Sequence, residues 1–267
     1  MSITNEDTYH ILRNGITGGL ANVIHRYNIK GQTHINKMKL EERKVLSYDL
    51  DHIMTHITGV DKNSLYPSMF SGLKQDFIKY TDCSKYWVMN FYYNFLCRCL
   101  DQNRFHYVYG DTDSMMFAVA GDPNLDYTQG FSAIVSDKQF YDENFYKFFP
   151  DPGKDVYDEK KLLGVAYEHC GLSLIALAPK NYWLLEDLDK KNPETVKLKG
   201  LNLKSNPQIN KQAIEENIKN GTVVKGKNMS LRQRAGEMSQ IEFLKNGITG
   251  CHTKMLTADS YKCQNLQ

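Results

Sequence analysis

The distribution of hydrophobic and polar residues along this chain predicts a sheet partly covered by helices. The runs 105–109 and 115–119 are rich in aromatic and β-branched residues and flank a short polar segment, which is typical of a β-hairpin. Two more apolar runs, at 57–60 and 172–177, have the length of buried strands. Between 85 and 100, apolar residues recur at helical spacing, so we expect a helix on one face of the sheet. The predicted fold class is therefore α+β.

The C-terminal part of the chain differs from the rest in charge. From Lys197 onward, twelve Lys and Arg residues stand against five Asp and Glu residues, a net charge of about +7, whereas the whole chain carries +2. The polar segment 209–236 shows scattered helical spacing, so we expect a small, mainly helical basic region over 197–267. A basic lobe suits binding to a nucleic-acid backbone, although a solvated helical face has the same composition.

Two carboxylates lie in the polar segment of the predicted hairpin, within Tyr-Gly-Asp-Thr-Asp-Ser at Tyr109–Ser114. Asp111 and Asp113 offer hard oxygen ligands, which suit Mg²⁺ and leave positions for substrate phosphates. An Asp-x-Asp pattern also occurs in turns for structural reasons, since Asp side chains hydrogen-bond neighbouring backbone groups. Sugar-nucleotide transferases hold their metal with the same pattern. A third carboxylate from another strand would favour phosphoryl or nucleotidyl transfer instead.

Asp61 supplies such a carboxylate, in Asp-Lys-Asn-Ser-Leu-Tyr-Pro-Ser at 61–68. It follows an apolar run, and Ser64 and Pro67 are suited to cap and begin a short helix. We therefore expect Asp61 at the end of a strand, close to Asp113. Two metals held by such carboxylates can align an attacking and a leaving oxygen, as in polymerases and nucleases. Taken alone, Asp61 would be better explained as a helix cap.

Asp-x-x-Ser-Leu-Tyr-Pro-Ser followed by Tyr-Gly-Asp-Thr-Asp-Ser resembles the first and third palm motifs of the family B DNA polymerases. The resemblance implies a polymerase palm, an antiparallel sheet with helices on one face, that adds deoxynucleotides to a primer on template DNA. It also implies that Asp61 and Asp113 bind two Mg²⁺ ions, with Mn²⁺ as an alternative metal, and that Asp111 supports the site. The residues that would contact the incoming deoxynucleoside triphosphate are Ser64, Leu65 and Tyr66.

Shorter elements extend the resemblance along the chain. Ile16–Gly19 is similar to the Tyr-x-Gly-Gly element of protein-primed members, although Ile stands in place of Tyr. Ala178–Trp183 fits the Lys-x-Tyr element, and Lys197–Gly200 resembles the Lys-x-Lys-Gly loop. The run 90–96 is similar to polymerases of self-synthesising transposons and related viruses, which implies a terminal protein as primer. The residues with implied DNA-binding roles are Gly18, Gly19, Lys180, Tyr182, Lys197 and Lys199. Without the two carboxylate motifs, these lysines would be interpreted as solvated surface residues.

The chain departs from the family between its two carboxylate motifs. Family members carry there a fingers helix with Lys-x-x-x-Asn-Ser-x-Tyr-Gly, and this sequence contains no Asn-Ser-x-Tyr-Gly. Only fifty positions separate Asp61 from Asp111, which leaves 72–84 for a fingers region. That segment is too short for two helices of about eleven residues each. The sixty residues before Asp61 are likewise too few for a proofreading exonuclease domain.

The expected organisation is a palm-like domain over 1–196, with a shortened fingers region near 72–84, and a basic thumb-like region over 197–267. The first functional hypothesis is a DNA-directed DNA polymerase of the protein-primed type. The alternative is a catalytically impaired remnant that binds primer-template DNA but selects no nucleotide. Because of the short fingers region, this alternative fits the isolated chain better.

Cysteine usage and hydropathy predict the compartment. The six cysteines include no Cys-x-x-Cys pair, and no apolar run is long enough to cross a bilayer. We therefore expect a soluble, intracellular protein without a membrane partner. These patterns do not distinguish nucleus, cytoplasm and mitochondrion.

Overall fold

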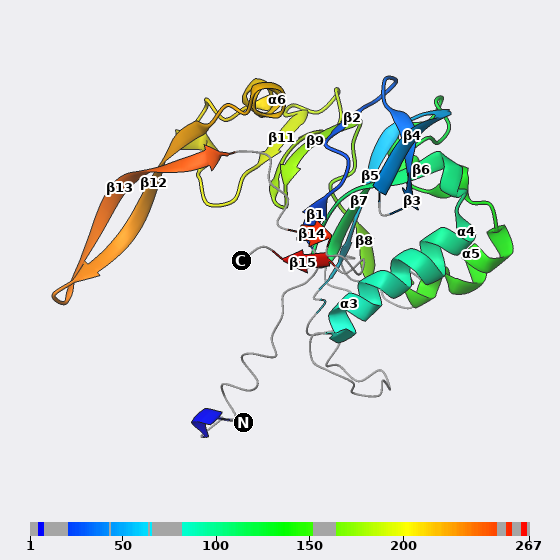
Figure 1. The fold of residues 1–267 in the computed structure, drawn as a ribbon, viewed down its shortest axis with the longest axis horizontal. Helices are drawn as coiled ribbons and strands as arrows, with labels where there is room; N and C mark the ends of the chain where they lie inside the picture. Colours follow the sequence, from blue (N-terminus) through cyan, green and yellow to red (C-terminus); the bar gives the residue numbers. More distant parts are fainter. Residues whose placement is uncertain are drawn as a thin grey trace.

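Two antiparallel sheets packed face to face, with a layer of helices outside the first, form the body of the protein (Figure 1). The computed structural model describes residues 5–7, 21–42, 44–63, 65, 82–151, 164–249, 255–257 and 263–265. Within these residues the fold is mixed α and β, and neighbouring strands of both sheets pair in the antiparallel direction. The expected α+β class is confirmed at this level.

The first sheet contains both carboxylate motifs. Its five strands lie in the order β1-β6-β7-β5-β8. Their bounds are Ala21–Val23 for β1, His56–Lys62 for β5, Phe105–Asp111 for β6, Ser114–Val119 for β7 and Val165–Tyr167 for β8. β6 and β7 form the predicted hairpin, and β5 lies beside β7 with Asp61 opposite Ser114. Antiparallel pairing therefore brings Asp61 to the turn that carries Asp111 and Asp113.

The second sheet holds the apolar strand predicted near 172–177. Its four strands lie in the order β11-β10-β9-β2. Their bounds are Tyr27–Ile29 for β2, Ser173–Ala178 for β9, Asn181–Leu185 for β10 and Glu194–Lys197 for β11. Side chains of β9 alternate between two core layers, as strand geometry requires. Leu174 and Ala176 pack toward the first sheet, whereas Ile175 shares a buried cluster with residues of helix α6 (Lys211–Asn220).

The helical layer covers the opposite face of the first sheet. The helix predicted at 85–100 is present as α3 (Asp82–Met89), a π-helical segment (Asn90–Leu96) and α4 (Cys97–Cys99) in succession. α5 (Lys138–Asn144) lies beside α4 (Figure 1). Phe91, Phe95 and Phe117 are fully buried in the cluster between this layer and the sheet. Short 3₁₀ turns occur at Gln102–Arg104, Tyr127–Gln129, Ser132–Ile134, Phe145–Lys147 and Leu203–Ser205.

Two-stranded hairpins complete the described structure. They are β3 (His34–Glu41) with β4 (Lys44–Ile53), β12 (Val224–Arg234) with β13 (Glu237–Ile248), and β14 (Met255–Thr257) with β15 (Cys263–Asn265). The β12–β13 hairpin projects away from the body (Figure 1).

The expectation of a mainly helical region over 197–267 is wrong. In the described part of this region, α6 is followed by the long β12–β13 hairpin. Most side chains of this hairpin are exposed on both of its faces. Since neither face is buried along most of the hairpin, the sequence lacks the alternation of apolar and polar residues by which a strand is recognised.

Candidate metal and nucleic-acid site

Segments that are far apart in the sequence line one pocket of about 390 Å³. Strand β5 contributes Asp61, and the β6–β7 hairpin contributes both carboxylates of its turn. The β9–β10 turn and the loop after β11 contribute the basic motifs. The residues assigned to metal or DNA binding from the sequence that line this pocket are Asp61, Asp111, Asp113, Lys180, Tyr182, Lys197 and Lys199.

Backbone hydrogen bonds fix the three aspartates relative to one another. The Asp113 amide donates to the Asp111 carbonyl oxygen at 2.7 Å, and Thr112 between them adopts the left-handed conformation with φ of 63°. The Lys62 amide donates to the Asp113 carbonyl oxygen at 3.0 Å, which ties β5 to the turn. The side chain of Asp111 is only 10% exposed. The tight turn and the paired strand therefore hold all three aspartates at the same end of the neighbouring strands β6, β7 and β5.

Tyr109 connects the carboxylate hairpin to the Lys-x-Tyr turn. The Lys180 amide donates a hydrogen bond to the Tyr109 hydroxyl at 3.2 Å, and the rings of Tyr109 and Tyr182 lie 5.6 Å apart. Lys180 has a left-handed backbone with φ of 62°, which is uncommon for a residue with a Cβ. Its ammonium lies 3.2 Å from the Asp111 carboxylate. The two motifs, seventy residues apart, thus form one hydrogen-bonded unit.

The electrostatics of the pocket are those of crowded carboxylates. Burial raises the pKa of Asp61 to about 6, with further upward contributions from Asp113, Glu168 and Asp111, while Lys180 acts in the opposite direction. Burial and the charge of Asp111 also raise the pKa of Asp113. Both shifts have the sign expected when carboxylates are buried and lie close to one another. A divalent cation would relieve this repulsion.

The donor set fits Mg²⁺ or Mn²⁺, since carboxylate oxygens are the preferred ligands of these ions. Among the described residues, no three His, Cys, Asp or Glu side chains are gathered closely enough to coordinate one ion. The Lys180 ammonium is a direct ion-pair partner of Asp111. Asp61, Asp113 and Glu168 are the other carboxylates that line the pocket.

Glu168 and His169 also line the pocket. The sequence left two interpretations of Glu168 open, a further acidic group near the site and, in preference, a surface carboxylate, and it gave no role to His169. Strand β8 pairs with β5 so that Asp61 is opposite Ala166, and the Glu168 amide donates to the Gly59 carbonyl oxygen at 2.9 Å. Glu168 follows Ala166 by two positions, which places it on the face that carries Asp61. Only the strand pairing reveals this, because nothing local marks Glu168 as different from other acidic residues.

The basic loop after β11 lies next to the Lys-x-Tyr strand. Lys197 is opposite Tyr182 in the β10–β11 pairing, and the Lys199 amide donates to Asn181 Oδ1 at 3.1 Å. These contacts place the lysines of two sequence motifs on one wall of the carboxylate pocket. Cations at this position suit phosphate groups of a strand whose end reaches the carboxylates.

The remaining assigned residues are either outside the described part of the chain or part of the core. Gly18, Gly19, Ser64 and Tyr66 are outside the described residues. Leu65 is 1% exposed and belongs to the cluster between the first sheet and the helices, so its side chain is part of the core.

Comparisons of the chain with protein-family profiles, with curated proteins and with solved structures found no match. The resemblance to a polymerase family therefore rests on the sequence motifs. Among the helices of the described residues, none combines the length and the apolar character that crossing a membrane requires.

Proposed function

We propose that this chain comprises the palm and a thumb-like region of a family B DNA-directed DNA polymerase of the protein-primed type. It would add deoxynucleotides to a primer end by nucleotidyl transfer. Its partners would be primer-template DNA, deoxynucleoside triphosphates and, for initiation, a terminal protein. The observation that supports this proposal is the single pocket lined by two acidic and two basic sequence motifs.

The roles of the residues follow from their positions. Asp61 and Asp113 would hold the metal ions, while the ion pair with Lys180 neutralises Asp111 beside them. Bound Mg²⁺ supplies charge neutralisation at the transferred phosphoryl group and alignment of the attacking and leaving oxygens. Lys197 and Lys199 would hold backbone phosphates near the reacting end.

The reaction itself is a displacement at phosphorus. The 3′-oxygen of the primer forms a bond to the α-phosphorus, and the bond from that phosphorus to the bridging oxygen of pyrophosphate breaks. The hydroxyl proton leaves to solvent. The chain would contribute mainly by positioning the reactants and by stabilising charge, which are the dominant effects in phosphoryl transfer.

Primer extension tests the proposal. The purified chain is incubated with labelled primer-template, Mg²⁺ and all four deoxynucleoside triphosphates, beside the variant Asp113→Asn. We expect extension by the natural chain and none by the variant, with unchanged circular dichroism. Asp51→Asn, at an exposed position of β4, is the matched control and should extend normally. A natural chain that does not extend the primer would refute the proposal.

The second candidate is a remnant that binds primer-template without extending it. The short segment between the carboxylate motifs favours this candidate, because no Asn-Ser-x-Tyr-Gly element is available to bind the triphosphate. Fluorescence anisotropy with labelled primer-template distinguishes the two candidates. Salt-sensitive binding without extension supports the remnant, and extension that depends on Asp113 excludes it.

A further inference from the structure

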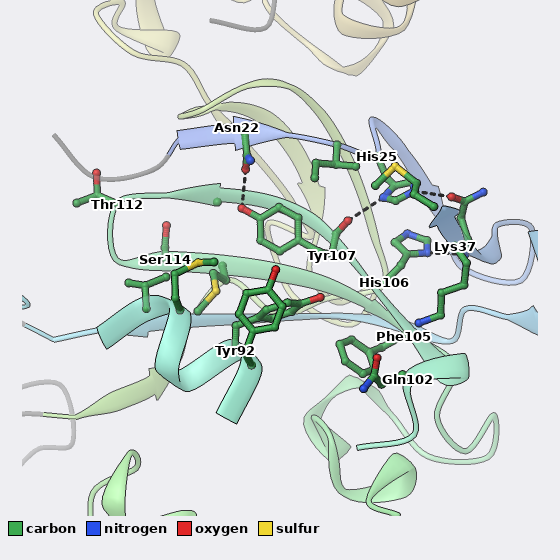
Figure 2. Close-up of a pocket in the computed structure, with 18 residues that line it drawn as sticks. Asn22, His25, Lys37, Tyr92, Gln102, Phe105, His106, Tyr107, Thr112 and Ser114 are labelled. Carbon is green, nitrogen blue, oxygen red and sulfur yellow. Dashed lines mark hydrogen bonds between the residues drawn. The ribbon is translucent and has the colours of Figure 1, made fainter. Parts of the chain in front are cut away.

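A second cavity lies on the opposite face of the β6–β7 hairpin from the carboxylates. Its volume is about 510 Å³, within the roughly 300–1,000 Å³ typical of small-molecule sites. Figure 2 shows its two ends, with Thr112 and Ser114 of the hairpin turn at one and Lys37 of β3 with Gln102 at the other. Helix α3 and the segment after it form one wall, and β6 forms another.

Aromatic side chains line much of this cavity. Tyr92 and Tyr93 come from the segment after α3, and Phe105 and Tyr107 come from β6. The Tyr92 ring packs edge-on against the Tyr107 ring with centroids 6.3 Å apart, and the Tyr107 hydroxyl donates to Asn22 Oδ1 at 2.7 Å (Figure 2). Tyr93, by contrast, remains 54% exposed. An exposed ring of this kind is suited to stacking on a planar base.

The charge of the cavity is positive. Among the described residues that line it there is no Asp or Glu, and Lys37 is the one Lys or Arg. Within the described part of the chain, Lys37 forms no ion pair, and its ammonium lies 5.8 Å from the centroid of the Phe105 ring. Burial lowers the pKa of Lys37, with smaller upward contributions from Cys97 and Asp101. An anionic group of a ligand would give the ammonium a direct ion-pair partner.

The polar residues deeper in the cavity are already satisfied. His106 Nε2 contacts Asn28 Oδ1 at 2.9 Å, and its Nδ1 accepts a hydrogen bond from the Asn36 amide at 3.0 Å. His25 contacts the Tyr107 carbonyl oxygen at 2.7 Å and Asn36 Oδ1 at 2.9 Å. Because these groups already have hydrogen-bond partners within the protein, the tyrosines and Lys37 are the side chains that we expect to contact a ligand.

The two cavities meet at the hairpin turn. Ser114 lines both of them, whereas Asp111 and Asp113 line the first and Thr112 the second. A nucleic-acid strand that crosses this turn would therefore present neighbouring nucleotides to both.

We propose that the second cavity binds a nucleotide, with its base on the exposed ring of Tyr93 and its phosphate at Lys37. The nucleotide is either free or an unpaired residue of a strand that crosses the hairpin turn. The strand-bound form rests on the proposed function, whereas binding of a free nucleotide does not require it. An exposed aromatic ring and an ammonium in one cavity match both parts of a nucleotide.

The test measures binding without Mg²⁺, by anisotropy of a fluorescent single-stranded oligodeoxynucleotide and by calorimetry with free deoxynucleoside monophosphates. The variants are Tyr93→Ala and Lys37→Met. Tyr86→Ala is the matched control on the same helix, since Tyr86 is 64% exposed and does not line the cavity. Lys39→Met is the matched control on the same strand, with Lys39 held by Glu41. Thermal unfolding of all four variants verifies that they fold.

We expect Tyr93→Ala to weaken binding roughly tenfold, within the range of one base stacked on an aromatic ring. Lys37→Met should weaken it similarly and reduce the slope of log K against log salt by about 0.7 for an oligonucleotide. Loss confined to the oligonucleotide identifies an unpaired nucleotide of a strand, and loss with the monophosphate identifies a free one. Equal binding by the cavity variants and their controls would overturn the proposal.

A further variant keeps this result independent of the polymerase proposal. Asp113→Asn removes a carboxylate of the first pocket and leaves the second cavity intact. Oligonucleotide binding that persists in Asp113→Asn but falls in Tyr93→Ala supports the second cavity, even if no primer is extended. Extension that depends on Asp113, together with binding insensitive to Tyr93 and Lys37, would refute only the second cavity.

Discussion

Replacing Asp61 by Asn should stabilise the metal-free protein at neutral pH, although it removes a proposed metal ligand. The substitution keeps the size and shape of the side chain and removes its charge. At pH 7 the carboxyl of Asp61 is mostly ionised, because its pKa lies at about 6, yet burial and the charges of Asp113 and Glu168 make ionisation unfavourable. The neutral amide does not carry that cost.

The magnitude follows from the shift in pKa. A rise from 3.8 to about 6 corresponds to about 3 kcal/mol, at about 1.4 kcal/mol for each pKa unit. Because the pocket is open to solvent, the repulsion is screened, and we expect about 1–2 kcal/mol of the free energy of unfolding. For a chain of this size, that is an increase in melting temperature of about 2–6 °C.

The raised pKa of Asp61 also determines how its contribution to the free energy of unfolding changes with pH. Asp61 is more basic in the folded protein than in the unfolded chain, so its favourable contribution is present below pH 3.8 and is lost as the pH rises through about 6. The difference in unfolding free energy between Asp61→Asn and the natural chain should therefore be small at pH 4 and reach its maximum near pH 7. Urea denaturation at several pH values measures it.

Two further measurements complete this assay. Mg²⁺ that binds the folded chain should raise its free energy of unfolding as the Mg²⁺ concentration increases, and Asp61→Asn should lose this increase. Asp51→Asn, at an exposed site, should change neither quantity. If Asp61→Asn were no more stable than the natural chain at pH 7, or if the difference did not vary with pH, the carboxylates would not be crowded and desolvated as described.

Three other substitutions test the pocket and the packing around it. Lys180→Met removes the partner of Asp111 and one cation from the pocket, so primer-template binding should weaken and its salt slope should fall by about 0.9, measured by anisotropy. Gly59→Ala would place a Cβ 1.9 Å from the Glu168 carbonyl oxygen, so we expect a loss of about 1–3 kcal/mol in urea denaturation. Phe95→Ala leaves a cavity between helix and sheet and should cost about 3–5 kcal/mol by the same measurement. A loss below about 1 kcal/mol for Phe95→Ala would contradict the packing of that layer.

Prediction from the sequence succeeded where local chemistry and burial agree. The β6–β7 hairpin was recognisable because aromatic and β-branched runs flank a polar turn, and the helix at 85–100 because one of its faces is buried. The π-helical segment at Asn90–Leu96 was not foreseen, since a change in helical winding leaves the spacing of apolar residues nearly unaltered. The β12–β13 hairpin was missed because its strands bury little of either face.

Some residues of the candidate site were recognisable from the sequence, and others were not. Asp61, Asp111 and Asp113 were identified by their motifs, and Lys180, Lys197 and Lys199 by weaker ones. Glu168 was not, because its position depends on the pairing of β8 with β5, a contact between segments that are over one hundred residues apart. The second cavity was not foreseen either, since its lining comes from strands, a helix and a turn that share no motif.

By itself, the sequence of this protein determined which residues have the chemistry for metal and phosphate binding and which short elements carry them. Residue type, turn propensity and the spacing of apolar residues are local properties, and they can be read along the chain. The tertiary structure decided that Asp61 faces the turn of β6 and β7, that Lys180 pairs with Asp111, and that Glu168 joins them. Those outcomes depend on strand order and register, which are set by the burial of two sheet faces at once and by no single segment.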